Sequence, residues 1–513
     1  MSTVNQSETI RDLLERGQPA KVALVVAGAG VSITYDQLRR QVDELSAMFN
    51  RLGLGRDDRI AMALPNGLEA LIAFLAAAHA ATAAPLNPAY KRDEFAFYLQ
   101  DTRAKALIVQ PQGADEALAA ADEGIIILRA QVGTEGRLQV VSSGRIGVER
   151  EPAQPHPEET ALVLHTSGTT SRPKCVPLSH TNLIASARQI AQTYQLSSED
   201  VSFCVMPLYH VHGLVGSTLA ALWAGGTVVI VPRFNALSFW STVRQYGVTW
   251  FSAVPTIHQL LLSRVKPGTR PAGAEQLRFI RSSSAPLPPA MMAQMEESFG
   301  VPVVEAYGMT EAAHQMTSNP LPPGRRKPGS VGPGTGVSIA ILDDQGHHLP
   351  LGTTGAVAVK GPNVFRGYEN NPEANAESFT DGWFRTGDEG WLDSDGYLTL
   401  VGRTKEMINR GGEKISPREI DEVLLMHPAV AEAVTFAVPD QVYGEEVAAA
   451  VVLKASATPA QLLAHCRSVL ADFKCPKVIH LVDAIPRTAA TGKVQRRVVA
   501  AEIARRMQQQ GGS

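Results

Sequence analysis

Residues 165–174 combine hydroxyl groups, a glycine and a lysine in a pattern that could bind phosphate. The segment reads His-Thr-Ser-Gly-Thr-Thr-Ser-Arg-Pro-Lys and directly follows the apolar run 161–164. Backbone N–H groups at the end of a strand can converge on an anion, the Ser and Thr hydroxyls add donors, and Lys174 adds positive charge. The segment therefore predicts a phosphate-binding loop, although a surface turn rich in Ser and Thr has a similar composition.

The sequence does not match the P-loop of NTP-splitting enzymes. That loop requires Gly, four residues and then Gly-Lys-Ser/Thr, so that the lysine begins a helix. Here Lys174 follows Pro173, a residue that interrupts a helix. The rest of the chain must therefore decide which phosphate chemistry the loop serves.

Length and charge predict a multidomain enzyme that acts on a small molecule. The 513 residues exceed what one hydrophobic core usually supports. The net charge of −3 and the isoelectric point near 6.5 provide no strong field for nucleic acid or an anionic membrane. The N-terminal segment lacks the features of a secretion signal, and the apolar run 70–85 is short for a membrane span and predicts a buried helix. We expect a cytoplasmic protein with no membrane or nucleic-acid partner.

The cysteines are widely spaced. Cys175, Cys204, Cys466 and Cys475 include no pair at the spacing of a metal-ligand or redox motif. Their pattern indicates neither a zinc site nor a disulfide framework, and it favours a reducing compartment.

The first four hundred residues alternate between β-rich apolar runs and helical stretches, which is typical of a layered α/β fold. We expect strands over 228–232, 250–254 and 301–306. Helices are expected to begin at Thr256 and to cover 288–299.

The pattern of the sequence changes beyond Gly402. The remaining residues, about 110, form a unit whose size is typical of a domain. Ser416 and Glu419 form a predicted capping box that begins a helix extending through Met426. The other expected elements are strands over 434–438 and 447–453 and a helix over 459–470.

Six further motifs follow the loop in order along the chain. They are Pro-Leu-Tyr-His-Val-His-Gly (207–213), Arg-Ser-Ser-Ser-Ala-Pro (281–286), Glu-Ala-Tyr-Gly-Met-Thr-Glu (305–311), Trp-Phe-Arg-Thr-Gly-Asp (383–388), Gly-Arg-Thr-Lys (402–405) and Pro-Arg-Thr-Ala-Ala-Thr-Gly-Lys (486–493). Over essentially the whole chain this resembles the adenylate-forming superfamily of acyl-CoA synthetases, adenylation domains and luciferases. The resemblance implies a large α/β N-terminal domain of several subdomains (1–402), a hinge (403–405) and a small, mobile α+β C-terminal domain (406–513).

The resemblance also implies a two-step reaction. A carboxylate is a poor acyl donor, so it first attacks the α-phosphorus of ATP to give an acyl-adenylate and pyrophosphate, and the thiol of coenzyme A then displaces AMP. In the family Thr310 would bind the α-phosphate, and Glu311 would hold Mg²⁺, a cation that prefers oxygen ligands. The β- and γ-phosphates would be bound by Thr166, Ser167, Gly168, Thr169, Thr170, Ser171 and Lys174.

Other nucleotide contacts are implied in the same way. Tyr307 would stack on adenine, and Asp388 would accept from the ribose hydroxyls with Arg403 nearby. The adenine would be supported by Ser284, Ala285, Pro286, Glu305 and Ala306.

Two lysines have family roles that require movement. Lys493 would bridge the attacking carboxylate and the α-phosphate, opposing charge on the transferring group. Lys405 occupies the hinge position, about which rotation would bring Gly411 and Gly412 toward the pantetheine arm.

Within the superfamily the chain most resembles the oxalate–CoA ligase branch, through the motifs at 171–174, 209–212, 311–320 and 408–416. His210 matches the position beside the reacting carboxylate. His212, Ser284 and His314 would face the acid, where imidazole and hydroxyl groups can satisfy a second carboxylate that is costly to bury unpaired.

Several alternatives remain open from the sequence. The acid could be another small or aromatic one, and a stand-alone adenylation enzyme would load a carrier protein, although the chain ends soon after Lys493 and coenzyme A is the simpler acceptor. A luciferase-type oxygenase would need an apolar pocket. A non-catalytic nucleotide-binding protein would not need to keep the family's charged residues, and the protein could be a monomer or a homodimer.

One residue departs from the family pattern. Cys175 follows Lys174 where the family usually has glycine. A positive φ there would strain the cysteine. Otherwise its thiol would lie near the ATP site, and we hypothesise that its alkylation or oxidation would slow adenylation.

Overall fold

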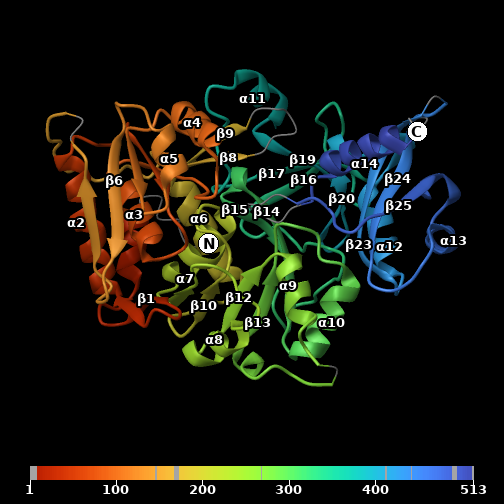
Figure 1. Ribbon diagram of the computed structural model, residues 1–513, viewed down its shortest axis with the longest axis horizontal. Coiled ribbons are helices and arrows are strands. Elements are labelled where there is room, and N and C mark those ends of the chain that lie inside the picture. The colour runs from red at the N-terminus through yellow and green to blue at the C-terminus, as the bar shows by residue number, and fades with distance from the viewer. Residues whose placement is uncertain are drawn as a thin grey trace. The chain divides into compact units, whose positions relative to one another are not determined.

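The computed structural model describes residues 8–144, 147–166, 173–266, 268–410, 413–440, 442–487 and 494–510. The chain divides into two compact units. Unit 1 comprises Met1–Ser338 and Val359–Gly382, and unit 2 comprises Ile339–Ala358 and Trp383–Ser513. Figure 1 shows α/β layering in unit 1, as the sequence predicted.

Unit 1 contains a seven-stranded sheet in the order β7-β6-β5-β3-β4-β8-β9. Its inner pairs are parallel, and antiparallel pairs form at both ends, β6 with β7 and β8 with β9. The strands are β3 (Arg59–Ala63), β4 (Thr82–Pro85), β5 (Ala106–Val109), β6 (Ile126–Val132), β7 (Leu138–Ser142), β8 (Thr160–Thr166) and β9 (Lys174–Ser179). The predicted phosphate loop thus joins the two strands of an edge hairpin.

A second, eight-stranded sheet of unit 1 has the order β15-β14-β13-β12-β10-β11-β1-β2. The pairs from β1 through β14 are parallel, whereas β2 and β15 add antiparallel edges. The strands are β1 (Val22–Val26), β2 (Val31–Thr34), β10 (Val201–Cys204), β11 (Thr227–Ile230), β12 (Trp250–Ala253), β13 (Phe279–Ser282), β14 (Val303–Met309) and β15 (His314–Ser318). Parallel strands end at one edge of a sheet, which gathers residues distant in sequence.

The helices of unit 1 connect and cover these strands. They are α1 (Ile10–Leu13), α2 (Tyr35–Arg51), α3 (Leu68–Ala80), α4 (Arg92–Asp101), α5 (Asp115–Ala120), α6 (His180–Thr193), α7 (Ala220–Trp223), α8 (Phe239–Tyr246), α9 (Pro255–Leu262), α10 (Pro289–Phe299) and α11 (Pro372–Ser378), with short turns η1 (Leu14–Arg16), η3 (Ala274–Gln276) and η4 (Thr310–Ala312) and a π-helix η2 (His212–Leu219). Strand β18 (Phe379–Thr380) follows α11. No helix in the described part of the chain is long and apolar enough to cross a membrane.

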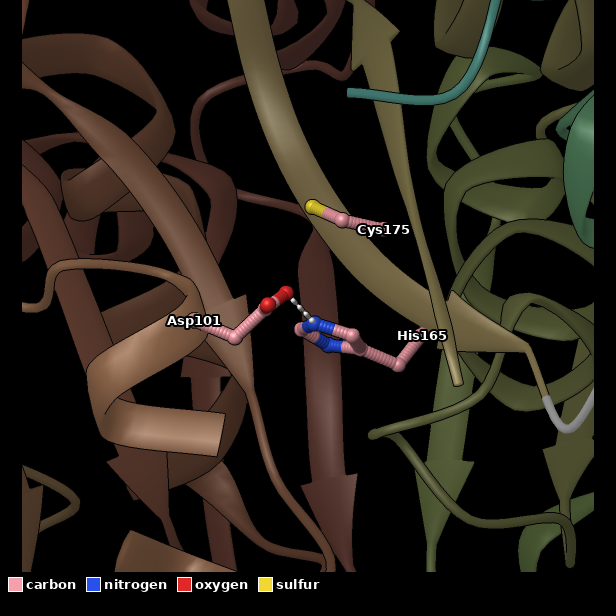
Figure 2. A group of neighbouring side chains, drawn as sticks. All are labelled: Asp101, His165 and Cys175. Carbon is pink, nitrogen blue, oxygen red and sulfur yellow. Dashed lines mark hydrogen bonds and ion pairs between the residues drawn. The ribbon is translucent and has the colours of Figure 1, made fainter. Parts of the chain in front are cut away.

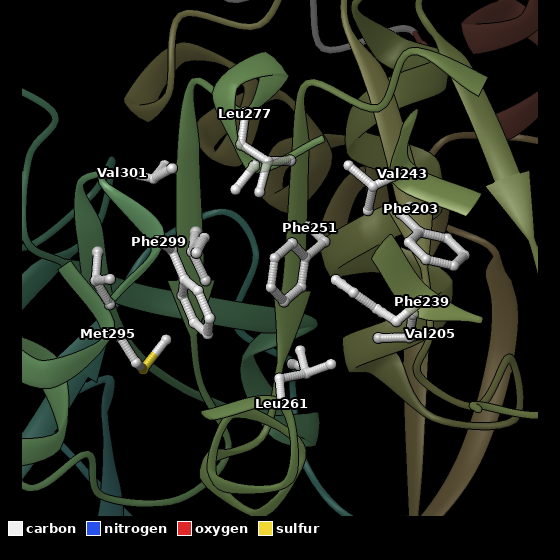
Figure 3. Packing of buried hydrophobic residues seen from close by; sticks show 14 of the residues in the cluster. Phe203, Val205, Phe239, Val243, Phe251, Leu261, Leu277, Met295, Phe299 and Val301 are labelled. Carbon is white, nitrogen blue, oxygen red and sulfur yellow. The ribbon is translucent and has the colours of Figure 1, made fainter. Parts of the chain in front are cut away.

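Aromatic side chains fill the space between the eight-stranded sheet and helices α8 and α10 (Figure 3). Phe203 on β10 and Phe251 on β12 pack around Phe239, whose ring lies 4.9 Å from that of Phe251 in an edge-on arrangement. Phe299 at the end of α10 belongs to the same cluster. Burying one such ring contributes about 1.5–3 kcal/mol, so this cluster stabilises the packing of the helices on the sheet.

Unit 2 contains a second α/β assembly. Strands β21 to β25 form one sheet in the order β22-β21-β24-β23 with β25 on β24, and helices α12 and α14 contact β23. The elements that lie wholly or mostly in unit 2 are β16 (Ser338–Leu342), β17 (Gly355–Lys360), β19 (Trp383–Leu392), β20 (Leu398–Arg403), η5 (Thr404–Glu406), β21 (Ile408–Arg410), β22 (Glu413–Ile415), α12 (Pro417–Met426), β23 (Val430–Asp440), β24 (Gly444–Leu453), α13 (Pro459–Val469), η6 (Asp472–Lys474), β25 (Val478–Leu481) and α14 (Arg496–Gln510).

Two local predictions need correction. The run 70–85 is not one helix, because α3 ends at Ala80 and residues 82–85 form the buried strand β4 between β3 and β8. The predicted capping box is only half formed. Ser416 caps α12 by accepting from the Glu419 amide, but the Glu419 carboxylate pairs with Lys474 at 2.7 Å instead of returning to the cap.

Candidate active site

The phosphate loop itself lies outside the described residues, but its two ends are described. Thr166 at the end of β8 and Lys174 at the start of β9 are opposite one another in the hairpin. The predicted contacts that lie outside the described residues are Ser167, Gly168, Thr169, Thr170, Ser171, Gly411, Gly412 and Lys493.

Tyr368 connects the end of this hairpin to the predicted metal ligand. The Lys174 Nζ atom lies 4.5 Å from the centre of the Tyr368 ring, and the Tyr368 hydroxyl donates to Glu311 Oε1 at 2.9 Å. Glu311 is 5% exposed, so its carboxylate is held in one orientation. The sequence analysis missed Tyr368, because no motif contains it.

Thr310 and Glu311 form the short turn η4, between β14 and β15. Ala313 and His314, which follow, have positive φ values of 48° and 111°. Such values cost energy in residues with side chains and cluster at functional sites. Here they reverse the chain so that Thr310 and Glu311 lie at the strand end and His314 begins the next strand.

The residues expected around adenine are held together by backbone contacts. Tyr307 is half-buried on β14. The Ser283 hydroxyl donates to the Ala306 carbonyl at 3.0 Å, and Glu305 Oε1 accepts from the Leu287 amide at 2.9 Å. These two bonds fix segment 283–287, which includes the predicted contacts Ser284, Ala285 and Pro286, against β14.

In unit 2, Asp388 and Arg403 lie opposite one another on β19 and β20. The Arg403 Nε atom is 2.7 Å from Asp388 Oδ1, and the carboxylate is largely buried. The structure therefore places these two residues side by side. Lys405 follows in η5 and is exposed.

The three residues expected to face the acid come together in unit 1. Ser284 Oγ is 2.9 Å from His212 Nδ1, and the rings of His212 and His314 stack with centres 5.0 Å apart. Both imidazoles are at most 2% exposed. His210 is half-buried two residues before η2, the π-helix that begins at His212. π-Helical turns are rare and frequent at functional sites.

Gly216 lets η2 approach this pair closely. A Cβ atom on Gly216 would lie 2.4 Å from His314 Cδ2, a distance that side chains do not tolerate. The absence of a side chain at this position therefore allows the His314 ring to lie over the helix backbone.

A buried polar cluster lies behind His212, and the sequence analysis did not find it. Ser252 Oγ is 2.7 Å from His212 Nε2 and accepts from Arg281 Nη1 at 2.8 Å. Arg281 is fully buried on β13. Its other partners are Tyr194, the C-cap residue of α6, and Gln315 on β15.

Cys175 adopts ordinary strand geometry, so the possibility of a strained cysteine is excluded. It pairs with His165 across the hairpin and is not among the described residues with positive φ. Figure 2 shows its side chain beside Asp101 and His165, whose Oδ2 and Nε2 atoms are 2.9 Å apart. Possible metal-ligand atoms of these three residues lie within 4.8 Å of one another, although the spacing of the cysteines indicated no zinc site.

The thiol is poorly placed for the proposed reactivity. Cys175 is 5% exposed, and burial raises its pKa to about 12 with a further contribution from Glu369, whose Oε2 is 3.8 Å from Sγ. Thiolate, not thiol, reacts with alkylating agents and oxidants. The structure therefore argues against the alkylation hypothesis.

Comparison with known proteins identifies the family. The family model for AMP-binding enzymes matches residues 14–369, and the family model for the AMP-binding enzyme C-terminal domain matches residues 419–493. The chain belongs to the AMP-binding enzyme family. This AMP-binding enzyme is 45% identical to an oxalate–CoA ligase of Arabidopsis thaliana, over 96% of this chain and 98% of that protein.

Two further similarities agree with this assignment. An oxalate–CoA ligase of Saccharomyces cerevisiae is 44% identical, over 94% of this chain and 95% of the relative. The crystal structure of ATP-bound MatB from Rhodopseudomonas palustris matches with a TM-score of 0.87 and 32% identity, over 96% of this chain and 99% of that one. The predicted adenylate-forming fold is thus confirmed.

Proposed function

We propose that this AMP-binding enzyme is an oxalate–CoA ligase. The broader activity is that of an ATP-dependent acid–CoA ligase, which forms an acyl-adenylate and then a thioester with release of pyrophosphate and AMP. ATP and coenzyme A are its cosubstrates, and Mg²⁺ is its cofactor. Support for oxalate comes from the two ligases at 45% and 44% identity.

The observation that carries the choice of acid is the contact between His212, Ser284 and His314. A pocket for a fatty chain is lined by apolar side chains, whereas this cluster consists of two imidazoles and the Ser284 hydroxyl, which His212 holds in place. Burying a carboxylate without partners is costly, so a polar wall favours an acid with a second carboxylate.

The nucleotide roles follow the family positions. Thr310 contacts the α-phosphate, and Lys174 with Thr166 and the loop between them binds the outer phosphates. Glu311, a buried carboxylate oriented by Tyr368, is suited to hold Mg²⁺, which neutralises phosphate charge when bound. Tyr307 stacks on adenine and Asp388 accepts from ribose.

The C-terminal residues complete the proposal. Lys493 stabilises the charge that develops during adenylation. Residues 403–405 are the hinge between domains 1–402 and 406–513, and Gly411 and Gly412 approach the pantetheine arm. His210 lies beside the reacting carboxylate.

A panel of acids tests the choice of substrate. AMP release would be measured with ATP and coenzyme A for oxalate, malonate, acetate, benzoate and a medium-chain fatty acid. We expect kcat/KM for oxalate to exceed that for acetate about 100-fold or more, because a site built to bind a polar group rejects an analogue that lacks it. A preference for the fatty acid would contradict the proposed substrate and leave the ligase activity intact.

Omitting coenzyme A separates ligase from carrier-loading activity. Pyrophosphate release without coenzyme A, followed by AMP release only with a carrier protein, would favour the stand-alone adenylation enzyme. Rapid AMP release on adding coenzyme A supports the ligase.

Lys493→Ala tests the division of labour between the two steps. We expect a loss of about 100- to 1,000-fold in adenylation, the effect typical of removing one transition-state donor. Thioester formation from supplied acyl-adenylate should continue. Equal losses in both half-reactions would contradict the role of Lys493.

A further inference from the structure

Arg281 is a buried cation whose hydrogen-bond partners among the described residues are all neutral. It is fully buried on β13, where Nε donates to the Tyr194 hydroxyl at 2.9 Å, Nη1 to Ser252 Oγ at 2.8 Å and Nη2 to Gln315 Oε1 at 2.9 Å. Among the described residues no carboxylate forms an ion pair with it. Because guanidinium does not lose its proton in proteins, the positive charge persists inside the sheet.

The hydrogen bonds of Arg281 fix the direction of a donor chain. Ser252 Oγ accepts from Arg281, and its other hydrogen-bond partner in the described part of the chain is His212 Nε2, at 2.7 Å. The buried Ser252 hydroxyl hydrogen would lack an acceptor among these partners unless it points to Nε2, so Nε2 accepts. In neutral imidazole the remaining nitrogen then carries the hydrogen, so His212 Nδ1 donates to Ser284 Oγ at 2.9 Å.

Ser284 ends this chain of donors. Its hydroxyl accepts from His212, so its own hydrogen is available to a ligand. Ser284 has a φ of +70°, which is unusual for a residue with a side chain. This backbone conformation accompanies the placement of Oγ against His212 at the C-terminal end of β13.

We propose that Arg281 is a positioning residue that selects a dianionic acid. Through Ser252 it fixes the His212 tautomer, and the fixed tautomer makes Ser284 a donor toward the second carboxylate. Its charge, which no acid neutralises within the described residues, adds an attraction that a dianion feels more strongly than a monoanion. The selection of a dianionic acid rests on the proposed function, whereas the direction of the hydrogen bonds from Arg281 to Ser284 does not.

The electrostatic part is tested by substrate discrimination. Arg281→Met removes the charge, and we expect kcat/KM for the preferred diacid to fall about 10- to 100-fold, the range for a hydrogen bond to a charged group, while acetate changes less than about 3-fold. Arg281→Lys keeps the charge without the planar fork and should retain more of the discrimination between the diacid and acetate. Equal losses for diacid and acetate in Arg281→Met would overturn this part.

Arg278→Met is the matched control. Arg278 lies one residue before β13, and its charge is neutralised by Asp200 at 2.7 Å. Its removal should change the ratio of diacid to acetate kcat/KM by less than about 2-fold, because the Arg278 side chain is 37% exposed and solvent screens its charge. A change as large as that in Arg281→Met would show that any nearby cation has the same effect.

The donor chain is tested without any substrate. Nitrogen NMR of the ¹⁵N-histidine-labelled protein distinguishes the two tautomers, and the His212 signals are identified by their loss in His212→Gln. We expect the hydrogen on Nδ1 in the native protein and a mixture of tautomers in Ser252→Ala, which keeps Arg281 and severs the link. A hydrogen on Nε2 in the native protein would overturn the proposed chain of hydrogen bonds from Arg281 to Ser284. This test needs only the native protein, so it still applies if Arg281→Met fails to fold.

The two proposals fail in different ways. If the unmodified enzyme prefers a monoacid, the proposed substrate is wrong, and the tautomer of His212 still decides the donor chain. If it prefers oxalate but Arg281→Met keeps that preference, the selection of a dianion by Arg281 is wrong alone.

Discussion

Arg281 in unit 1 and Arg496 in unit 2 are both largely removed from water, but their charges are treated in opposite ways. Arg496 lies 2.6 Å from Asp421 and 3.1 Å from Glu406, and it also donates to the Thr435 carbonyl at 2.8 Å. Within the described parts of the chain, the hydrogen-bond partners of Arg281 are hydroxyl and amide groups. An arginine that is paired with carboxylates holds helices against a sheet. An arginine that no described carboxylate neutralises can still attract an anionic ligand.

The largest expected effect comes from breaking the neutralised pair. Asp421→Asn leaves Arg496 with one acid at its side, and removing one partner of a buried ion pair costs about 3–5 kcal/mol. Hydrogen exchange of amides in α12 and α14 would report the lower free energy of unfolding. Glu419→Gln on the same helix, which breaks the more exposed pair with Lys474, should cost less than about 1 kcal/mol. Equal effects of the two variants would contradict a structural role for the Arg496 network.

The second effect concerns a histidine that stays uncharged beside Arg281. His258 is fully buried next to the backbone of Arg281, and burial lowers its pKa to about 4. The unfolded chain binds this proton near pH 6.5, so the folded state loses stability as the pH falls from about 6.5 to 4, by about 3 kcal/mol in all. Urea unfolding across this range should show a flatter pH dependence in His258→Leu. His156→Asn, at an exposed site, should leave the slope unchanged.

The third effect tests how closely the acid site is packed. In Gly216→Ala the added Cβ would displace the His314 ring, and overpacking of this kind costs about 1–3 kcal/mol. The midpoint temperature of thermal unfolding should fall, and kcat/KM for the acid substrate should fall about 10-fold. Gly124→Ala, where a Cβ meets nothing within 4 Å, is the control. Unchanged kinetics in Gly216→Ala would remove His314 from the acid site.

The smallest effect is expected at Cys175, outside both arginine networks. Since the thiol is buried with a pKa raised to about 12, iodoacetamide at pH 8 should modify it more slowly than a free peptide thiol by a factor of about 100 or more. Mass spectrometry of the folded protein measures the rate. Fast modification of Cys175 would reinstate the redox hypothesis.

The sequence predicted most of the local structure. The strand expected at 250–254 is β12 (Trp250–Ala253), the helix expected over 288–299 is α10, and the strand expected over 447–453 lies within β24. These predictions succeeded because hydrophobic period and turn residues act locally. The prediction of one buried helix over 70–85 was wrong because alanine can be accommodated in both a buried helix and a buried parallel strand.

The candidate site was predicted only where a motif contained it. His212, Ser284 and His314 were found in this way, and so was Asp388 with Arg403. Tyr194, Ser252 and Gln315 come from three separate elements, and no spacing rule connects them to the charge that they surround. That no described carboxylate pairs with Arg281 is likewise a tertiary property, which the sequence alone does not reveal.

The burial of every native thiol has a practical consequence. All four cysteines of the chain are buried and none forms a disulfide. Two cysteines engineered at exposed positions, one before residue 403 and one after residue 405, should therefore accept fluorescent dyes in an otherwise unaltered background. Energy transfer between such dyes would follow, during turnover, any rotation of the C-terminal domain about Lys405.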